Sequence, residues 1–220
     1  MDQLTFDEWW EEFLNDTHPR EDFYETLHRL RTFIGGLSST KRDAFVAGMV
    51  DVACDRRDGW SLALSALERF GGREARRRLH DTVIALPEVR PPHPLGDYRD
   101  SVLRVLASDS ESEFIAPVEE FCRQQIGPGF TGVVWALWPH RRDMFARYHA
   151  RFFVEAPAEW WARKAVIQAF VSEPEALVAV RDALRDQPST WEAVREAALW
   201  ASSGSSVAPD RSVVIHRICG

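Results

Sequence analysis

Apolar side chains recur every three or four residues along most of the chain, and this helical period constrains its fold more than any other feature. The pattern starts at the segment Thr5–Glu8, a capping box in which the threonine hydroxyl can accept a hydrogen bond from the first helical turn while the glutamate reaches back. The sequence therefore predicts a helix from residue 6 onward. Its apolar stripe consists of Phe6, Trp9, Trp10, Phe13 and Leu14.

Stripes with the same period continue toward the C-terminus and are interrupted by glycine or proline, which stop helices. An alternating pattern typical of a strand first occurs at residues 212–218, SVVIHRI, after the serine-rich stretch 202–206. We therefore predict an all-α chain that ends in a short irregular or strand-like tail.

The strongest interruption is PEVRPPHPLG, residues 87–96, which contains four prolines. Proline lacks the amide donor and restricts the residue before it, so no helix is expected to cross this stretch. We predict an N-terminal helical half at residues 1–86, a proline-rich kink or linker at 87–96, a C-terminal helical half at 97–204 and a tail at 205–220.

Two segments of the C-terminal half are similar to each other. WARKAVIQAF and WEAVREAALW each place a cation two residues before an alanine, and the two cations, Arg163 and Arg195, are 32 positions apart. Short helices at such a period, with turns marked by proline, resemble bacterial HEAT-type repeats. The resemblance implies an α-α superhelix, or solenoid, of antiparallel helix pairs.

Charge is distributed unevenly along the chain, whose net charge is −7. Residues 1–25 contain nine acids and one cation, which leaves 25 acids and 26 cations in residues 26–220. An acidic run of this kind is commonly a solvated helix face, and acids are also favoured near a helix N-terminus. The alternative interpretation is a surface that attracts a basic partner.

The first helix carries the residues that would form such a surface. Adjacent tryptophans lie about 100° apart around a helix, so Trp9 and Trp10 cannot both point to one core. We expect an inner face of Phe6, Trp10 and Phe13, with Trp9 at the boundary as an aromatic anchor. The candidate binding residues of this helix are Asp7, Glu8, Trp9, Glu11 and Glu12.

No motif identifies an enzyme, a metal site or a cofactor. Glu25 and His28 have the spacing of a di-iron helix motif, but no second such pair occurs. His80-Asp81 alone is a very weak match to a metal phosphohydrolase, and nucleophile-elbow, Walker and dinucleotide motifs are absent. The sequence favours a non-catalytic protein without metal or cofactor over an enzyme.

A weaker resemblance points to the alkylpurine DNA glycosylases that are built from HEAT-like helices. Trp160, Arg163, Ala165 and Val166 match a helix start of that family, whereas Ala162 stands where the family has a first arginine. The resemblance implies contact with DNA through Trp160 and Arg163. Because residues 26–220 have a surplus of only one cation, charge argues against nucleic acid as the partner.

The leading interpretation is a non-catalytic, protein-binding helical repeat module. A bacterial immunity protein that neutralises a toxin with a basic surface fits this charge pattern; the alternative is a HEAT-like DNA-binding protein or DNA-repair glycosylase. The acidic start, MDQLTFDEWWEE, is unlike a secretory signal, and no run of about 18 apolar residues occurs. We therefore expect a cytoplasmic protein without a membrane segment.

Overall fold

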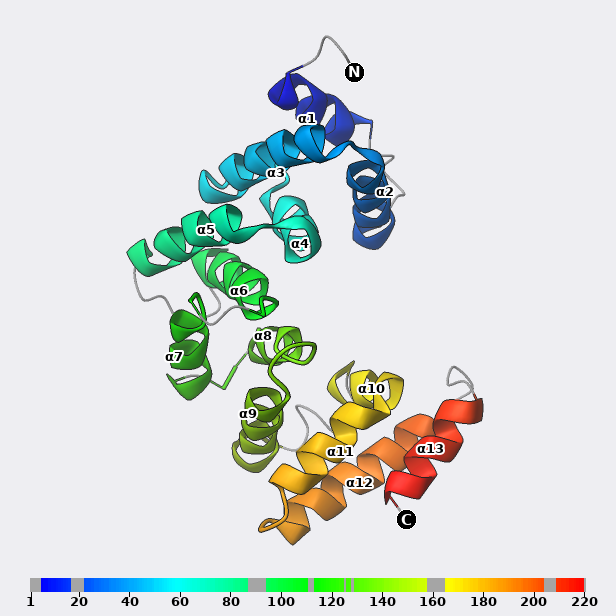
Figure 1. Cartoon of the computed structure of the whole chain (residues 1–220). Helices are drawn as coiled ribbons and strands as arrows, with labels where there is room; N and C mark the ends of the chain where they lie inside the picture. Colours follow the sequence, from blue (N-terminus) through cyan, green and yellow to red (C-terminus); the bar gives the residue numbers. More distant parts are fainter. Residues whose placement is uncertain are drawn as a thin grey trace. The chain divides into compact units, whose positions relative to one another are not determined.

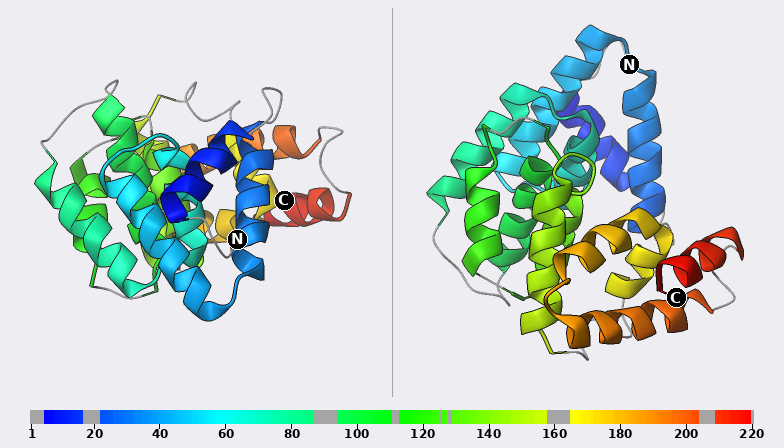
Figure 2. Two further views of the ribbon diagram at one scale, coloured as in Figure 1. Left: turned by 90° about the horizontal axis from the view of Figure 1, so that it is seen from above. Right: turned by 60° about the horizontal axis from the view of Figure 1, so that its bottom comes forward.

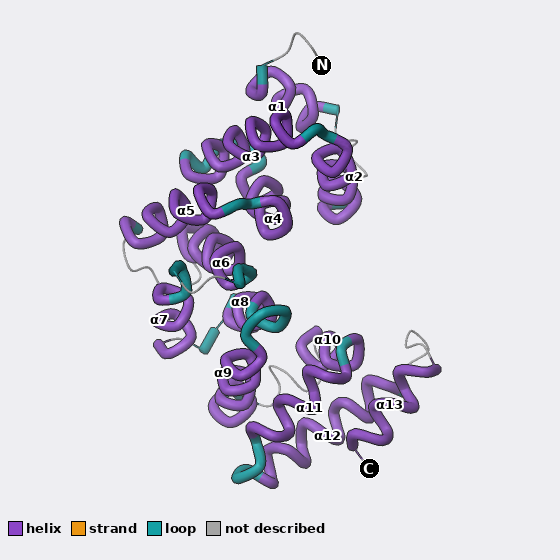
Figure 3. The backbone as a smooth tube through the Cα atoms, viewed as in Figure 1, coloured by secondary structure: helices purple, strands orange, loops and turns teal. Residues whose placement is uncertain are grey.

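The computed structural model describes residues 5–16, 22–86, 94–110, 113–124, 126–127, 129–157, 165–203 and 209–219. These residues form thirteen α-helices and contain no strand (Figures 1 and 3). The predicted all-α class is confirmed. Contacts divide the chain into two compact units, Met1–Glu119 and Glu120–Gly220.

The first unit is a stack of helices around an aliphatic core. Helix α3 packs against α1, α2, α4 and α5, while α4 and α5 both pack against α6. Fully buried leucines and valines of α3 to α6, among them Leu64, Leu67 and Leu79, fill the space between the helices. The helices are α1 (Phe6–Asn15), α2 (Phe23–Gly36), α3 (Ser39–Cys54), α4 (Trp60–Phe70), α5 (Arg73–Ala85) and α6 (Pro94–Ala107).

The second unit has a more aromatic core. Trp135, Phe145, His149 and Phe170 contact one another, with ring centroids between 4.3 and 5.9 Å apart. Helix α11 packs against α9 and α13, and α12 packs against α10 and α13 (Figure 2). The helices are α8 (Phe130–Ala136), α9 (Arg142–Glu155), α10 (Ala165–Ser172), α11 (Pro174–Ala183), α12 (Pro188–Ser202) and α13 (Pro209–Cys219), and α7 (Ala116–Gln124) spans the division between the units.

Local signals explain where several helices begin. The capping box of α1 is present as predicted, and α2 has a second one, in which Asp22 accepts from the Glu25 amide at 2.8 Å. Pro174 and Pro188 stand in the first turns of α11 and α12, where a missing amide donor costs nothing.

The prediction of a strand-like C-terminal tail was wrong, because residues 212–218 lie within helix α13. Ile215 and Cys219 are four residues apart and both buried, so they share the face that packs against the preceding helices. Arg195 of α12 donates a hydrogen bond to the carbonyl of Cys219 at 2.8 Å, which satisfies one of the acceptors at the helix end.

The predicted linker at 87–96 lies mostly outside the described residues. Helix α6, which begins at Pro94, packs against α4 and α5 within the first unit. Within the described ranges no helix is both long and apolar enough to cross a membrane.

Candidate functional site

Helix α1 is held on the first unit by Trp10 and Phe13, which are both buried as predicted. The indole nitrogen of Trp10 donates to the carbonyl of Asp58, in the turn between α3 and α4, at 3.0 Å. A buried indole that is satisfied in this way combines a large apolar contact with a fixed orientation. These contacts therefore fix the rotation of α1 about its own axis.

Two glycines let α1 approach the rest of the unit closely. A Cβ atom on Gly48 of α3 would lie 2.4 Å from Cγ of Phe6, so the Phe6 ring occupies the space that any other residue would need. Gly59 has a φ of +79°, and a Cβ there would lie 2.9 Å from Cζ2 of Trp10. Phe6 itself is half-buried rather than fully buried.

Trp9 lies at the boundary, as expected, and is half-buried. Its ring stacks on Phe13 and Phe33, with centroids 5.0 and 4.6 Å away, and meets Phe45 edge-on at 4.8 Å. A pocket of about 200 Å³ opens beside it between α1 and α3. The pocket is lined by Thr5, Phe6, Trp9, Leu37, Lys41, Ala44 and Phe45.

The carboxylates of α1 face the solvent, as predicted. Asp7 forms an ion pair with Arg57 at 2.8 Å, and Glu8 is held by the Thr5 amide and hydroxyl, which lower its pKa. Glu11 and Glu12 form no ion pair with a described residue. The outward surface of the helix thus keeps two carboxylates that are available to a partner.

The structure gathers five of the seven predicted binding residues on this helix: Asp7, Glu8, Trp9, Glu11 and Glu12. Trp160 and Arg163 lie outside the described residues. Sequence reasoning missed the contributions of Lys41 and Ala44 to the pocket, because they come from a different helix and no local pattern relates them to Trp9.

The other residue pairs considered from the sequence form no recognisable reactive site. Glu25 and His28 are exposed on α2, and Nδ1 of His80 lies 3.2 Å from an exposed carboxylate oxygen of Asp81. Across the described residues, no group of three or more histidine, cysteine, aspartate or glutamate side chains is placed to hold a metal ion.

Residues 141–151 contain four arginines and one acidic residue, and two of these arginines form contacts within the second unit. Arg142 pairs with Glu175 at 3.3 Å and lies over the Trp138 ring. Arg151 pairs with Glu155 and donates to backbone carbonyls of α7. These contacts reduce the positive charge that the segment can offer to a phosphate backbone.

Comparison with protein-family models, with curated proteins and with solved structures gives no match for this chain.

Proposed function

We propose that the chain is a non-catalytic protein-binding module of HEAT-like helix pairs, and that α1 meets a partner with a basic surface. The proposal rests on which side chains of α1 are buried and which are exposed. Buried anchors fix one face of the helix, the solvent-facing side presents Glu11 and Glu12, and a pocket opens at Trp9 between α1 and α3. Carboxylates steer a basic partner during association, while an aromatic pocket retains it.

The partner class that we favour is a basic protein, and an immunity protein that blocks a toxin is the biological setting that fits it best. The pocket beside Trp9 is small and largely apolar in its lining, so it suits one apolar side chain of the partner. The DNA-binding alternative receives less support, because Arg142 and Arg151 are already paired with carboxylates.

The test is a differential capture from an extract of the source cells, with the tagged full chain as bait. We expect wild type to retain a basic protein that is lost with the double variant Glu11→Gln and Glu12→Gln. The control is a double variant of exposed acids in the second unit, Asp186→Asn and Glu196→Gln, which changes the net charge by the same amount.

A second pair of variants probes the pocket. Ala44→Met places a longer side chain in the pocket, and Ala47→Met is its matched control on the same helix, because Ala47 is also exposed but does not line the pocket. Loss of the captured protein with Ala44→Met alone supports the proposal. Equal retention by all four variants would move the binding surface away from α1.

A further inference from the structure

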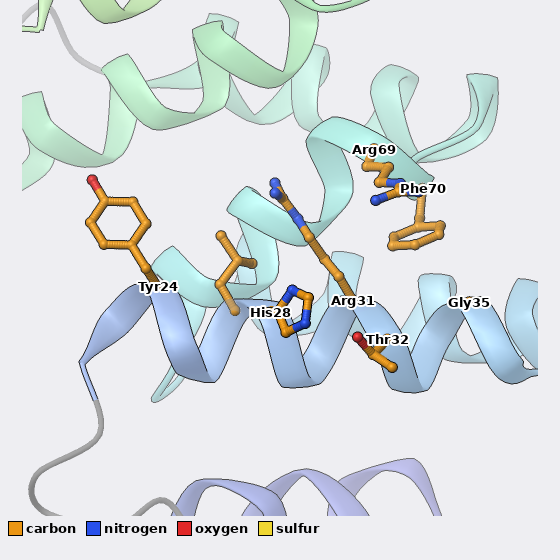
Figure 4. Close-up of a pocket in the computed structure, with 8 residues that line it drawn as sticks. Tyr24, His28, Arg31, Thr32, Gly35, Arg69 and Phe70 are labelled. Atoms are coloured by element: carbon orange, nitrogen blue, oxygen red, sulfur yellow. The ribbon is translucent and has the colours of Figure 1, made fainter. Parts of the chain in front are cut away.

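A second pocket, of about 460 Å³, lies in the first unit between α2 and the end of α4. Figure 4 shows that Tyr24, His28, Arg31 and Thr32 come from α2, whereas Arg69 and Phe70 come from α4. The Arg31 side chain extends from α2 toward α4, where its guanidinium donates to the carbonyl of Ser65 at 2.5 Å. The lining is completed by Leu27 and Gly35.

The two guanidinium groups bring positive charge to this pocket, and no ion pair within the described residues engages either of them. Neither Arg31 nor Arg69 is within ion-pair distance of a described carboxylate, and no acidic side chain lines the pocket. Glu68 is close enough for the charge of Arg31 to act on its pKa, but Arg104 engages it directly at 2.6 Å.

Many of the other described arginines, unlike Arg31 and Arg69, form ion pairs. Twelve of them form ion pairs with carboxylates: Arg29, Arg57, Arg73, Arg76, Arg77, Arg78, Arg104, Arg123, Arg142, Arg151, Arg181 and Arg195. Two guanidinium groups that share one pocket and form no ion pair there are suited to an anionic ligand. Arginine suits this role because its planar donor fork matches carboxylate and phosphate oxygens.

Aromatic rings and further polar groups surround the two arginines. Tyr24 is 78 % exposed, which is unusual for a side chain of its size, and Phe70 is half-buried beneath the Arg69 guanidinium, 5.5 Å from its ring centroid. His28 and Thr32 add an imidazole and a hydroxyl on the exposed side of α2. The pocket thus combines charged donors with faces on which a planar ring can stack.

We propose that this pocket binds a phosphate monoester that carries a planar ring, a ligand of the size and chemistry of a mononucleotide. Arg31 and Arg69 hold the phosphate, His28 and Thr32 contribute further hydrogen bonds, and an aromatic side chain of the lining stacks on the ring. The volume lies within the range of about 300–1,000 Å³ that small-molecule sites occupy. The site is independent of the protein-binding surface proposed for α1.

The test is isothermal titration calorimetry of the full chain with AMP, adenosine and inorganic phosphate as separate probes. We expect saturable binding of AMP with a Kd of about 1 mM or tighter, and weaker binding of the other two, since each lacks one half of the ligand. Arg69→Gln should weaken AMP binding about tenfold, because charge-assisted hydrogen bonds to phosphate are the strong ones. Arg77→Gln, at an exposed arginine outside the pocket, should not.

Adjacent glycines provide a second matched pair. Gly35 lines the pocket and Gly36 does not, and a Cβ at either position would meet no atom within 4 Å. Gly35→Glu should place a carboxylate near the arginines and weaken AMP binding about tenfold, while Gly36→Glu, with the same charge change, leaves it within about threefold of wild type.

Three results would overturn the proposal. The first is that wild type shows no heat of binding with AMP at concentrations of about 5 mM, well above the expected Kd. The second is that the pocket variant and the control variant of each pair have the same affinity. The third is that inorganic phosphate binds as tightly as AMP, because the ring would then contribute nothing and the ligand class would be wrong.

Discussion

His149 should make the second unit sensitive to acid. The side chain is fully buried among the rings of Trp135, Phe145, Phe153 and Phe170, and neither ring nitrogen meets hydrogen-bond geometry with a described partner. Burial lowers the pKa of His149 to about 3, and the carbonyl of Phe145 opposes this shift only in part. The folded state therefore holds the imidazole neutral at pH values where the unfolded chain protonates it.

The size of the effect follows from the two pKa values. An unfolded histidine has a pKa of 6.5, so the contribution of His149 to stability is complete above this value and is lost as the pH falls from 6.5 toward 3. Between about pH 8 and about pH 5, the free energy of unfolding should fall by about 2 kcal/mol through this residue alone.

Urea unfolding followed by tryptophan fluorescence at the two pH values measures this loss. The variant His149→Phe keeps an aromatic ring in the cluster but cannot titrate, so its loss between the two pH values should be smaller than that of wild type by about 2 kcal/mol. His140→Gln, at an exposed histidine of the same unit, is the control and should behave as wild type does. Equal losses in wild type and His149→Phe would refute the reasoning.

Three further predictions concern the folded chain. Gly48→Ala should push Phe6 away and lower the free energy of unfolding by about 1–3 kcal/mol through overpacking. Gly36→Ala, where the added Cβ meets no atom, should leave the free energy of unfolding unchanged or raise it slightly, and chemical denaturation compares the two variants. Phe170→Ala should lower the free energy of unfolding by about 3–5 kcal/mol, because its side chain is fully buried. Burial raises the pKa of Asp100 from its ordinary value of 3.8 to about 7, so the folded state loses stability as the pH rises between these two values. Asp100→Asn should therefore raise the melting temperature at about pH 8 but not at about pH 4.

Features that depend on short stretches of sequence were predictable. The capping box at Thr5 and the burial of Trp10 and Phe13 follow from a helical period and one cap, because both act within two turns. The partners of these residues were not predictable. The carbonyl that accepts from Trp10 is 48 positions away at Asp58, and nothing in the local pattern of α3 indicates that Gly48 lies under Phe6.

The direction of an apolar face was harder to predict where nearly every residue is apolar. In AVIQAFVS the helical period predicts that Val166 and Phe170, four residues apart, share the buried face. In the structure Val166 is only half-buried, and the buried positions are Ile167, Phe170 and Val171. Gln168 and Ser172 are the two polar residues of this segment, so it gives little contrast from which to fix the direction of the face, and tertiary packing decides it. The strand-like interpretation of residues 212–218 failed because their apolar run, residues 213–215, is too short to distinguish a strand from a helix.

The net charge of −7 gives little indication of how this protein would recognise a partner, because many charges of the described residues are paired with one another. The charges that concern the two proposed sites are local: Glu11 and Glu12 on α1, and Arg31 and Arg69 in the pocket between α2 and α4. Screening over about 8–10 Å at physiological ionic strength keeps such patches electrostatically separate when they are farther apart than this distance. One helical unit can therefore present an acidic surface to a protein and a cationic pocket to a small anion, although its total charge would suggest only the first.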